Sequence, residues 1–508
     1  MLARKSVFTF TADITNAILS YIALFFITKY MTPGAYGIIM FATGYVALIF
    51  VLGDLGFDSA HVKFISGGEK ESKCVGIHLA VKTILIVLGS IGVFISILVW
   101  KFVLHQGFET QDEEIVIYII LASIAIKGLA TPFQTTFAAK KEMVKNRVTM
   151  LGGTIARVIA IIYVALMGLG IMAFAFVYIA EAVATLILTS LLFFRKYTIE
   201  RPTMTYFKMY LSFAVPIMWA QILATILSNI NPVLIQFFYN SPDVGFYRAA
   251  LQIIVVLALF TNAIGTLLFP TISEMHVNGN KEGIKDIITK SERFLSMIGV
   301  PLVLCTVALA IPIAEVILNG WTPVAIILQA LAIYSLFSAL EQPYTALVMG
   351  ANKPVLMRNN LIITFIVDMV LNVIFIPSSL FGIPLLGLGG FGAALALTIA
   401  YGVGYFYCRT IAYKMLPKGA GSTSNSLKHI VAALIMAFAV YILAGYIPVM
   451  RWYWLIGLAL IYFCGYLLIL IGLREFKKED FTLIQSAINV KQMFQYAVEE
   501  IKENKDNK

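Results

Sequence analysis

The chain has 508 residues, of which 60% are hydrophobic and only 13% are charged. A soluble domain has about a quarter charged residues, so this composition excludes a soluble protein and predicts an integral membrane protein. The formal net charge of +10 raises the alternative of a nucleic-acid partner, and the distribution of the cations along the chain decides against it.

Apolar segments of the length that crosses a bilayer, about 20 residues each, follow one another along the whole chain. They predict an all-α integral membrane protein with about 14 transmembrane helices. In chain order the expected spans are 7–30, 36–58, 76–103, 114–138, 149–168, 171–194, 209–239, 245–271, 294–318, 324–348, 360–377, 389–412, 429–448 and 453–473.

Most lysines and arginines lie in alternate connections between these spans, for example in 140–147 and 409–428. The other connections hold only Lys29, Lys101 and Arg451. This asymmetry is the positive-inside pattern of membrane proteins. We therefore expect a plasma-membrane protein with both termini in the cytoplasm and no nucleic-acid partner.

The two halves of the sequence echo each other at an offset of about 210 residues. Pro33 and Gly37 recur as Pro242 and Gly245, and the run 131–147 resembles 342–358. Each copy covers about six spans, an even number, so the two copies point the same way through the membrane around a central cavity. The repeated Pro-Gly segment is predicted to close the first helical hairpin of each copy on the outer face.

These observations predict five parts of the chain. They are an N-terminal lobe (1–195), a cytoplasmic linker (196–208), a C-terminal lobe (209–412), two additional helices (413–473) and a cytoplasmic tail (474–508). The tail keeps apolar residues at near-helical spacing, which is typical of an amphipathic helix on the inner membrane surface. A partner-binding helix is the alternative.

Three stretches, 31–66, 240–250 and 387–402, together with the layout of the spans, resemble a known family. The chain is similar to the polysaccharide and oligosaccharide flippases of the multidrug/oligosaccharidyl-lipid/polysaccharide exporter superfamily. The resemblance implies two lobes that alternate between inward-open and outward-open states. It also implies a substrate made of a sugar chain on a polyprenyl phosphate or pyrophosphate.

Several charged and polar residues are expected at membrane depth, where each charge costs about 3 kcal/mol or more and tends to be functional. The cations Lys127, Arg157 and Arg248, with the amides Asn229 and Asn231, are candidates for a cavity that binds the phosphate and sugars. The carboxylates Asp13, Glu181 and Asp368 are candidates for binding a coupling proton or sodium ion. The alternative is structural: opposite charges such as Arg157 and Glu181 pair between helices, and the amides form interhelical hydrogen bonds.

Other function classes are weighed on the same residues. An ion-coupled exporter of organic cations, from the same superfamily, needs an acidic cavity, whereas the charges here are mixed. A membrane glycosyltransferase or polymerase needs a large outer loop with catalytic acids, and an enzyme is therefore not expected. Phosphate-binding glycine loops and clustered cysteines or histidines are absent from the sequence, so no cofactor and no metal is expected. The expected partners are a lipid-linked oligosaccharide, membrane lipids and a coupling ion, and the chain is expected to be a monomer.

One departure from related flippases for peptidoglycan precursor concerns the first span. Those proteins show an Arg-Asp pair there, whereas Asp13 is preceded by Ala12. The role of that cation is therefore not carried over to this chain.

Overall fold

The computed structural model describes residues 2–53, 55–103, 110–417, 423–447 and 449–475. The side chains of 2–10, 52, 111, 256–267 and 423–425 are outside this description. The tail helix expected over 474–508 lies almost entirely outside the described residues.

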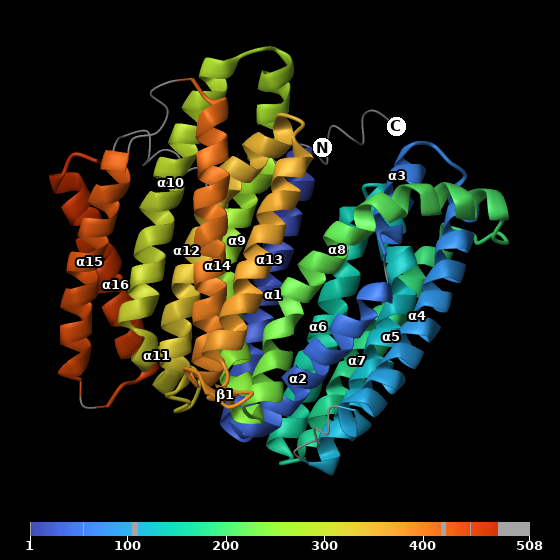
Figure 1. The fold of residues 1–508 in the computed structure, drawn as a ribbon, viewed down its shortest axis with the longest axis horizontal. Helices are drawn as coiled ribbons and strands as arrows, with labels where there is room; N and C mark the ends of the chain where they lie inside the picture. Colours follow the sequence, from blue (N-terminus) through green and yellow to red (C-terminus); the bar gives the residue numbers. More distant parts are fainter. Residues whose placement is uncertain (1, 54, 104–109, 418–422, 448, 476–508) are drawn as a thin grey trace. The chain divides into compact units, whose positions relative to one another are not determined.

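The described residues form helices, their connections and one short β-hairpin (Figure 1). In the hairpin, β1 (Ser379–Leu380) pairs antiparallel with β2 (Ile383–Pro384). The helices are α1 (Leu2–Tyr30), α2 (Pro33–Ile49), the 3-10 helix η1 (Phe50–Gly53), α3 (Phe57–Ser66), α4 (Glu71–Phe102), α5 (Gln111–Ala139), α6 (Met143–Leu166), α7 (Ile171–Phe194), α8 (Met204–Phe238), α9 (Ser241–Val277), α10 (Lys281–Ala308), α11 (Ala310–Val316), α12 (Val324–Gly350), α13 (Pro354–Phe375), α14 (Gly389–Met415), α15 (Thr423–Gly445) and α16 (Trp452–Gly472).

Among the described residues, 12 helices are long and apolar enough to cross a membrane. The protein is therefore a multi-pass membrane protein, as the composition predicts. The two further expected spans correspond to α2, an apolar helix of 17 residues, and to α9, which includes the segment 256–267 whose side chains are not described. The count of about 14 spans stays a prediction.

Two expected spans are interrupted in the structure. The span expected over 36–58 ends as an α-helix at Ile49, and η1 and a turn separate it from α3. The span expected over 294–318 breaks at Leu309, where α10 gives way to α11. The break at Leu309 lies inside continuous apolar sequence, whereas the first interruption coincides with Gly53, Asp54 and Gly56, which a window averaged over the span does not resolve.

The chain forms two compact units. The first, which we call the site unit, consists of residues 12–249 and 368–393, and the second unit consists of 1–11, 250–367 and 394–508. All eight residues proposed from the sequence as site residues lie in the site unit. The lobe boundaries expected from the internal repeat stay a prediction.

A buried aromatic cluster holds α3, α5, α7 and α8 together in the site unit. Phe137, Phe193 and Tyr210 are completely buried there. His61 joins the cluster through hydrogen bonds of 2.9 Å to the Tyr210 Oη and 2.8 Å to the Thr136 Oγ1. Burial and the neighbouring His78 hold the pKa of His61 well below its ordinary value. The imidazole is therefore neutral, and its two hydrogen bonds connect α3 to α5 and α8.

The repeated Pro-Gly segments pack against each other at the start of α2 and α9. A Cβ on Gly37 would lie 1.8 Å from the carbonyl oxygen of Ser241, and a Cβ on Gly245 would lie 2.2 Å from that of Pro33. Only glycine allows two helix backbones to approach this closely. The sequence echo therefore has a direct structural meaning, since each copy of the motif provides the glycine that the other copy requires.

In the second unit, Glu475 connects the end of α16 to two other helices. Its side chain is 5% exposed and accepts hydrogen bonds of 2.9 Å from Arg293 Nε and 3.0 Å from Lys428 Nζ. Arg293 Nη2 also donates to the Glu475 carbonyl oxygen at 2.7 Å. One carboxylate thus joins α10, α15 and the residues that follow α16.

Acid is expected to weaken this contact. Burial alone raises the pKa of Glu475, but the hydrogen bonds from Arg293 and Lys428 outweigh burial and hold the pKa below its ordinary value. The contact therefore stabilises the fold above the ordinary glutamate pKa of about 4.3 and is lost as pH falls through the lower folded value. Thermal unfolding of the wild type and of Glu475→Gln should differ at pH 7 and converge once the pH falls below the lowered pKa of Glu475. A difference that did not change with pH would contradict this assignment.

Candidate functional site

Three cations and one carboxylate gather in the site unit. Glu181 lies in α7 with its side chain 10% exposed. Lys127 Nζ, from α5, donates to Glu181 Oε1 at 2.9 Å, and Arg157 Nη1, from α6, donates to Oε2 at 3.4 Å. The predicted pairing of Arg157 with Glu181 is therefore present, but one carboxylate is shared by two cations.

The two cations differ in their surroundings. The Lys127 side chain is 52% exposed, so its ammonium group is accessible from outside the packed helices. Arg157 is 22% exposed; its Nη2 donates to Ser20 Oγ at 3.3 Å, while its Nε is buried without a hydrogen-bond partner among the described residues. Arg157 thus retains a donor that the folded chain does not use.

Arg248 lies on α9 one turn after Gly245, beside α2. Its Nη2 would be 3.3 Å from a Cβ at Gly44, so the absence of a side chain there makes room for the guanidinium. Within the part of the chain that the structure describes, Arg248 Nε and Nη2 are buried without hydrogen-bond partners. The phenols of Tyr36 and Tyr178 are close enough to interact electrostatically with both Arg248 and Arg157. Arg248 and Arg157 therefore share these tyrosine neighbours, and on that ground we group Arg248 with Arg157 and Glu181.

Asp13 has a different partner from any suggested by the sequence. Arg147, at the start of α6, contacts it with Nη1 at 3.1 Å from Oδ1 and Nη2 at 3.3 Å from Oδ2. One turn along α1, the Asn16 Oδ1 accepts a hydrogen bond of 2.7 Å from Thr154. Asp13 thus helps to join α1 to α6.

A buried polar cluster lies where α8, α9 and α13 meet. Asn231 is 2% exposed; its Nδ2 donates to Tyr247 Oη at 3.0 Å and its Oδ1 accepts from Asn372 Nδ2 at 2.8 Å. Asn229 instead donates to the Thr225 carbonyl oxygen in its own helix at 3.0 Å. Of the two predicted amides, only Asn231 makes these interhelical hydrogen bonds.

Asp368 lies next to this cluster and is completely buried. Neither of its carboxylate oxygens has a hydrogen-bond partner among the described residues, and the same holds for Asn372 Oδ1. The amide of Asn372, one helical turn further along α13, lies close enough to stabilise the charged form of Asp368, although the two side chains do not have regular hydrogen-bond geometry. A buried carboxylate without partners is costly, so this site calls for a proton or a cation.

Sequence reasoning found the charged members of these clusters and missed their polar partners. Ser20 and Asn372 were not singled out, because a lone hydroxyl or amide in an apolar helix gives no signal of its own. Arg147 was placed in a basic connection. The only signal in the sequence was helical spacing from a predicted site residue on the same helix, as between Asn372 and Asp368.

Comparison with known proteins supports the family resemblance found in the sequence. Residues 2–276 match the family described as polysaccharide biosynthesis protein. The chain is similar to the probable low-salt glycan biosynthesis flippase Agl15 of Haloferax volcanii, with 22% identity over 414 residues, which cover 79% of this chain and 81% of that protein.

Two solved structures share the fold. The inward closed conformation of the lipid II flippase MurJ is similar with a TM-score of 0.75 and 16% identity, covering 92% of this chain and 99% of that one. The inward-facing conformation of a multidrug resistance MATE family transporter of the MOP superfamily is similar with a TM-score of 0.63 and 14% identity, covering 79% and 95%. At these identities the likeness concerns the fold alone.

Proposed function

Because the chain belongs to the polysaccharide biosynthesis protein family, as its sequence resemblance indicated, we propose that it is a lipid-linked oligosaccharide flippase. It moves an oligosaccharide on a polyprenyl phosphate or pyrophosphate from the inner to the outer leaflet by alternating access, for the assembly of a surface polysaccharide or glycan. The observation that supports this best is the surplus of positive charge around Glu181.

The charge balance of the cluster suits a phosphate. Lys127, Arg157 and Arg248 provide three positive charges against one carboxylate. Arg157 and Arg248 also hold buried N–H groups without partners, which costs about 1–3 kcal/mol per group until an acceptor arrives. Phosphate oxygens are strong acceptors for guanidinium groups. The unused donors are therefore prepared for an anionic ligand.

Asp368 is the strongest of the three candidates for ion coupling. Asp13 is paired with Arg147 and Glu181 with two cations, whereas both Asp368 oxygens and the Asn372 Oδ1 are buried without partners in the described structure. Three oxygens of this kind suit a sodium ion, and a proton on Asp368 would neutralise it equally.

Replacing Asp368 with asparagine tests this coupling. The variant should fold as well as the wild type, because it removes a buried charge, and it should still move substrate down its concentration gradient. Its transport should no longer respond to an imposed proton or sodium gradient. Flipping is measured in proteoliposomes with each gradient imposed in turn. A variant that still responds to the gradient would exclude Asp368 as the coupling site.

Two other functions remain less favoured. A multidrug resistance transporter shares the fold, but an exporter of organic cations requires a surplus of negative charge where this cluster has a positive one. An enzyme acting on the same lipid is not supported, since the similar proteins carry the names of flippases and transporters.

Deletion of the gene separates these possibilities. A lipid-linked glycan should accumulate on the inner leaflet of the deletion strain, and the wild-type chain should remove it while a Lys127→Gln/Arg157→Gln double variant should not. Lys353→Gln, at an exposed position of the second unit, is the matched control. Altered drug resistance without glycan accumulation would favour the exporter.

A further inference from the structure

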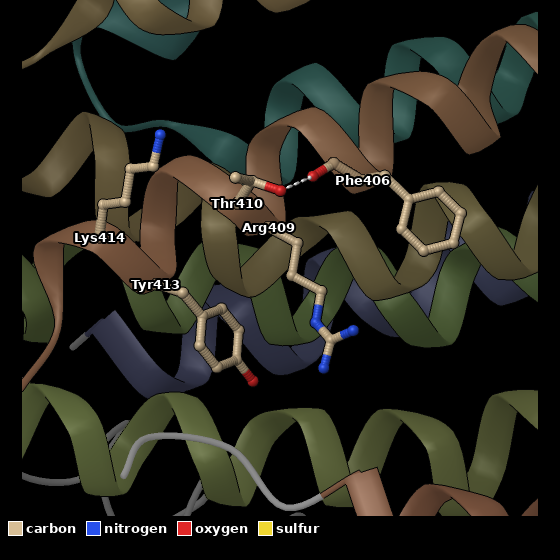
Figure 2. A pocket seen from close by; sticks show the side chains of 5 residues that line it. All are labelled: Phe406, Arg409, Thr410, Tyr413 and Lys414. Carbon is tan, nitrogen blue, oxygen red and sulfur yellow. Dashed lines mark hydrogen bonds between the residues drawn. The ribbon is translucent and has the colours of Figure 1, made fainter. Parts of the chain in front are cut away.

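The second unit contains an open pocket at the C-terminal end of α14. It has a volume of about 480 Å³ and is lined by Phe406, Arg409, Thr410, Tyr413 and Lys414 (Figure 2). Figure 2 shows the Arg409 and Tyr413 side chains next to each other on one side of α14, with Lys414 on the other side of the ribbon. Two cations thus flank one stretch of helix surface.

Arg409 is held in place but its hydrogen-bonding capacity is not used up. Its guanidinium carbon lies 5.1 Å from the centre of the Tyr413 ring, a cation–π contact that orients the group. Its Nε is buried without a hydrogen-bond partner among the described residues. The guanidinium of Arg409 lines the pocket, and a guanidinium is a favourable partner for an anion.

Glu292, a carboxylate near the pocket, is already engaged. Tyr413 Oη donates to both oxygens of Glu292, at 3.1 Å and 3.0 Å. The Thr410 hydroxyl donates to the Phe406 carbonyl oxygen at 2.7 Å. Glu292 interacts electrostatically with Arg409 and lowers the positive charge of the region, to which Lys414 adds a second cation.

The residues change in character along the helix. Phe406 is 57% exposed and lies towards the middle of α14, whereas Lys414 lies at the end of the helix, which is a candidate membrane span. The ends of such spans lie at the level of the lipid headgroups. An amphiphile with an apolar chain on Phe406 and an anionic group on Arg409, towards the Lys414 end of the helix, would match this order.

We propose that this pocket binds a phosphate group carried on an apolar chain, as in the headgroup of an anionic lipid. Two sources share this chemistry, namely an anionic membrane phospholipid and a free polyprenyl phosphate. The site is separate from the charge cluster around Glu181, and the proposal does not rest on the proposed function.

Binding to the delipidated full-length protein in a neutral detergent tests the proposal. The probes are phosphatidylglycerol, phosphatidylcholine, farnesyl phosphate and inorganic phosphate, and the readout is the concentration of each that half-saturates the rise in unfolding temperature. We expect phosphatidylglycerol or farnesyl phosphate to protect the wild type. Loss of a charge-assisted hydrogen bond should weaken this protection about tenfold in Arg409→Gln.

Two further variants keep the test informative if Arg409→Gln folds poorly. Lys414→Gln removes an exposed charge and should weaken binding about threefold, while Lys353→Gln, exposed elsewhere in the same unit, should bind as the wild type does. Tighter binding of phosphatidylglycerol than of farnesyl phosphate supports a phospholipid as the source, and the reverse supports the carrier lipid. Equal binding of phosphatidylcholine, equal protection by inorganic phosphate, or unchanged binding in both pocket variants would each overturn the proposal.

Discussion

Gly37→Ala is expected to destabilise the protein more than any other single methyl group added to the site unit. The new Cβ would lie 1.8 Å from the Ser241 carbonyl oxygen and 3.0 Å from the Gly245 nitrogen. Both are backbone atoms near the start of α9, so no side chain can rotate away. The two helices must separate, at a cost of about 3 kcal/mol, the upper end of ordinary overpacking. Thermal unfolding of the purified protein in detergent measures this loss.

Gly34→Ala is the matched control for this substitution. It lies one turn earlier on α2, and its Cβ would meet only the Pro242 side chain, at 3.5 Å, which is ordinary contact. Alanine is also the better helix former there, so this variant should be as stable as the wild type or slightly more so. Equal unfolding temperatures for Gly37→Ala and Gly34→Ala would show that the close approach of α2 and α9 is not required.

The crossing of α2 and α9 also bears on the charge cluster. Arg248 follows Gly245 by less than one helical turn, and Gly44 on α2 leaves room for its guanidinium. Gly37→Ala is therefore expected to lower transport as well as stability, since it moves Arg248 relative to α2. Gly245→Ala acts on the same contact, so the two effects should not add.

Much of the fold could be predicted because the bilayer constrains it. Each expected span overlaps a helix in the structure, since a chain in hydrocarbon must satisfy its backbone hydrogen bonds internally. The interruption at Phe50–Gly53 and the break at Leu309 escaped prediction. Their causes are local backbone geometry and packing, which a measure of apolar length does not contain.

The candidate site could be predicted by residue type, but among the ion pairs only that of Arg157 with Glu181 was anticipated. Lys127, Arg157, Glu181 and Asp368 were identified because charges at membrane depth are rare and costly. Which of them pair depends on tertiary contacts such as that between Arg147 and Asp13, which joins α6 to α1. The packing of the helices also decides whether a cation finds a partner or retains an unused donor. Arg147 is paired with Asp13, whereas Arg248 keeps buried donors without partners in the described part of the chain.

Arg248→Met is expected to lower transport and raise stability together. Arg248 Nε and Nη2 are buried without hydrogen-bond partners in the described part of the chain. Their removal should stabilise the fold by about 1–3 kcal/mol. If these donors meet the substrate phosphate, their loss should also weaken substrate binding about 10- to 100-fold. Flipping of a labelled short-chain polyprenyl-pyrophosphate sugar in proteoliposomes and thermal unfolding in detergent measure the two effects.

The same substitution at Arg147 should have the opposite effect on stability. Arg147 makes two contacts with Asp13, so Arg147→Met removes a satisfied pair and leaves a carboxylate without its partner, which lowers the unfolding temperature. Replacing a structural cation is therefore expected to lower stability, whereas replacing a ligand-binding cation is expected to raise stability and lower transport. If Arg248→Met unfolded as easily as Arg147→Met, or flipped substrate at the wild-type rate, Arg248 would not be a substrate-binding residue. Both variants lose one guanidinium from the same unit, so a general effect of net charge would change their unfolding temperatures in the same direction. Opposite changes in stability can therefore come only from the different partners of the two arginines.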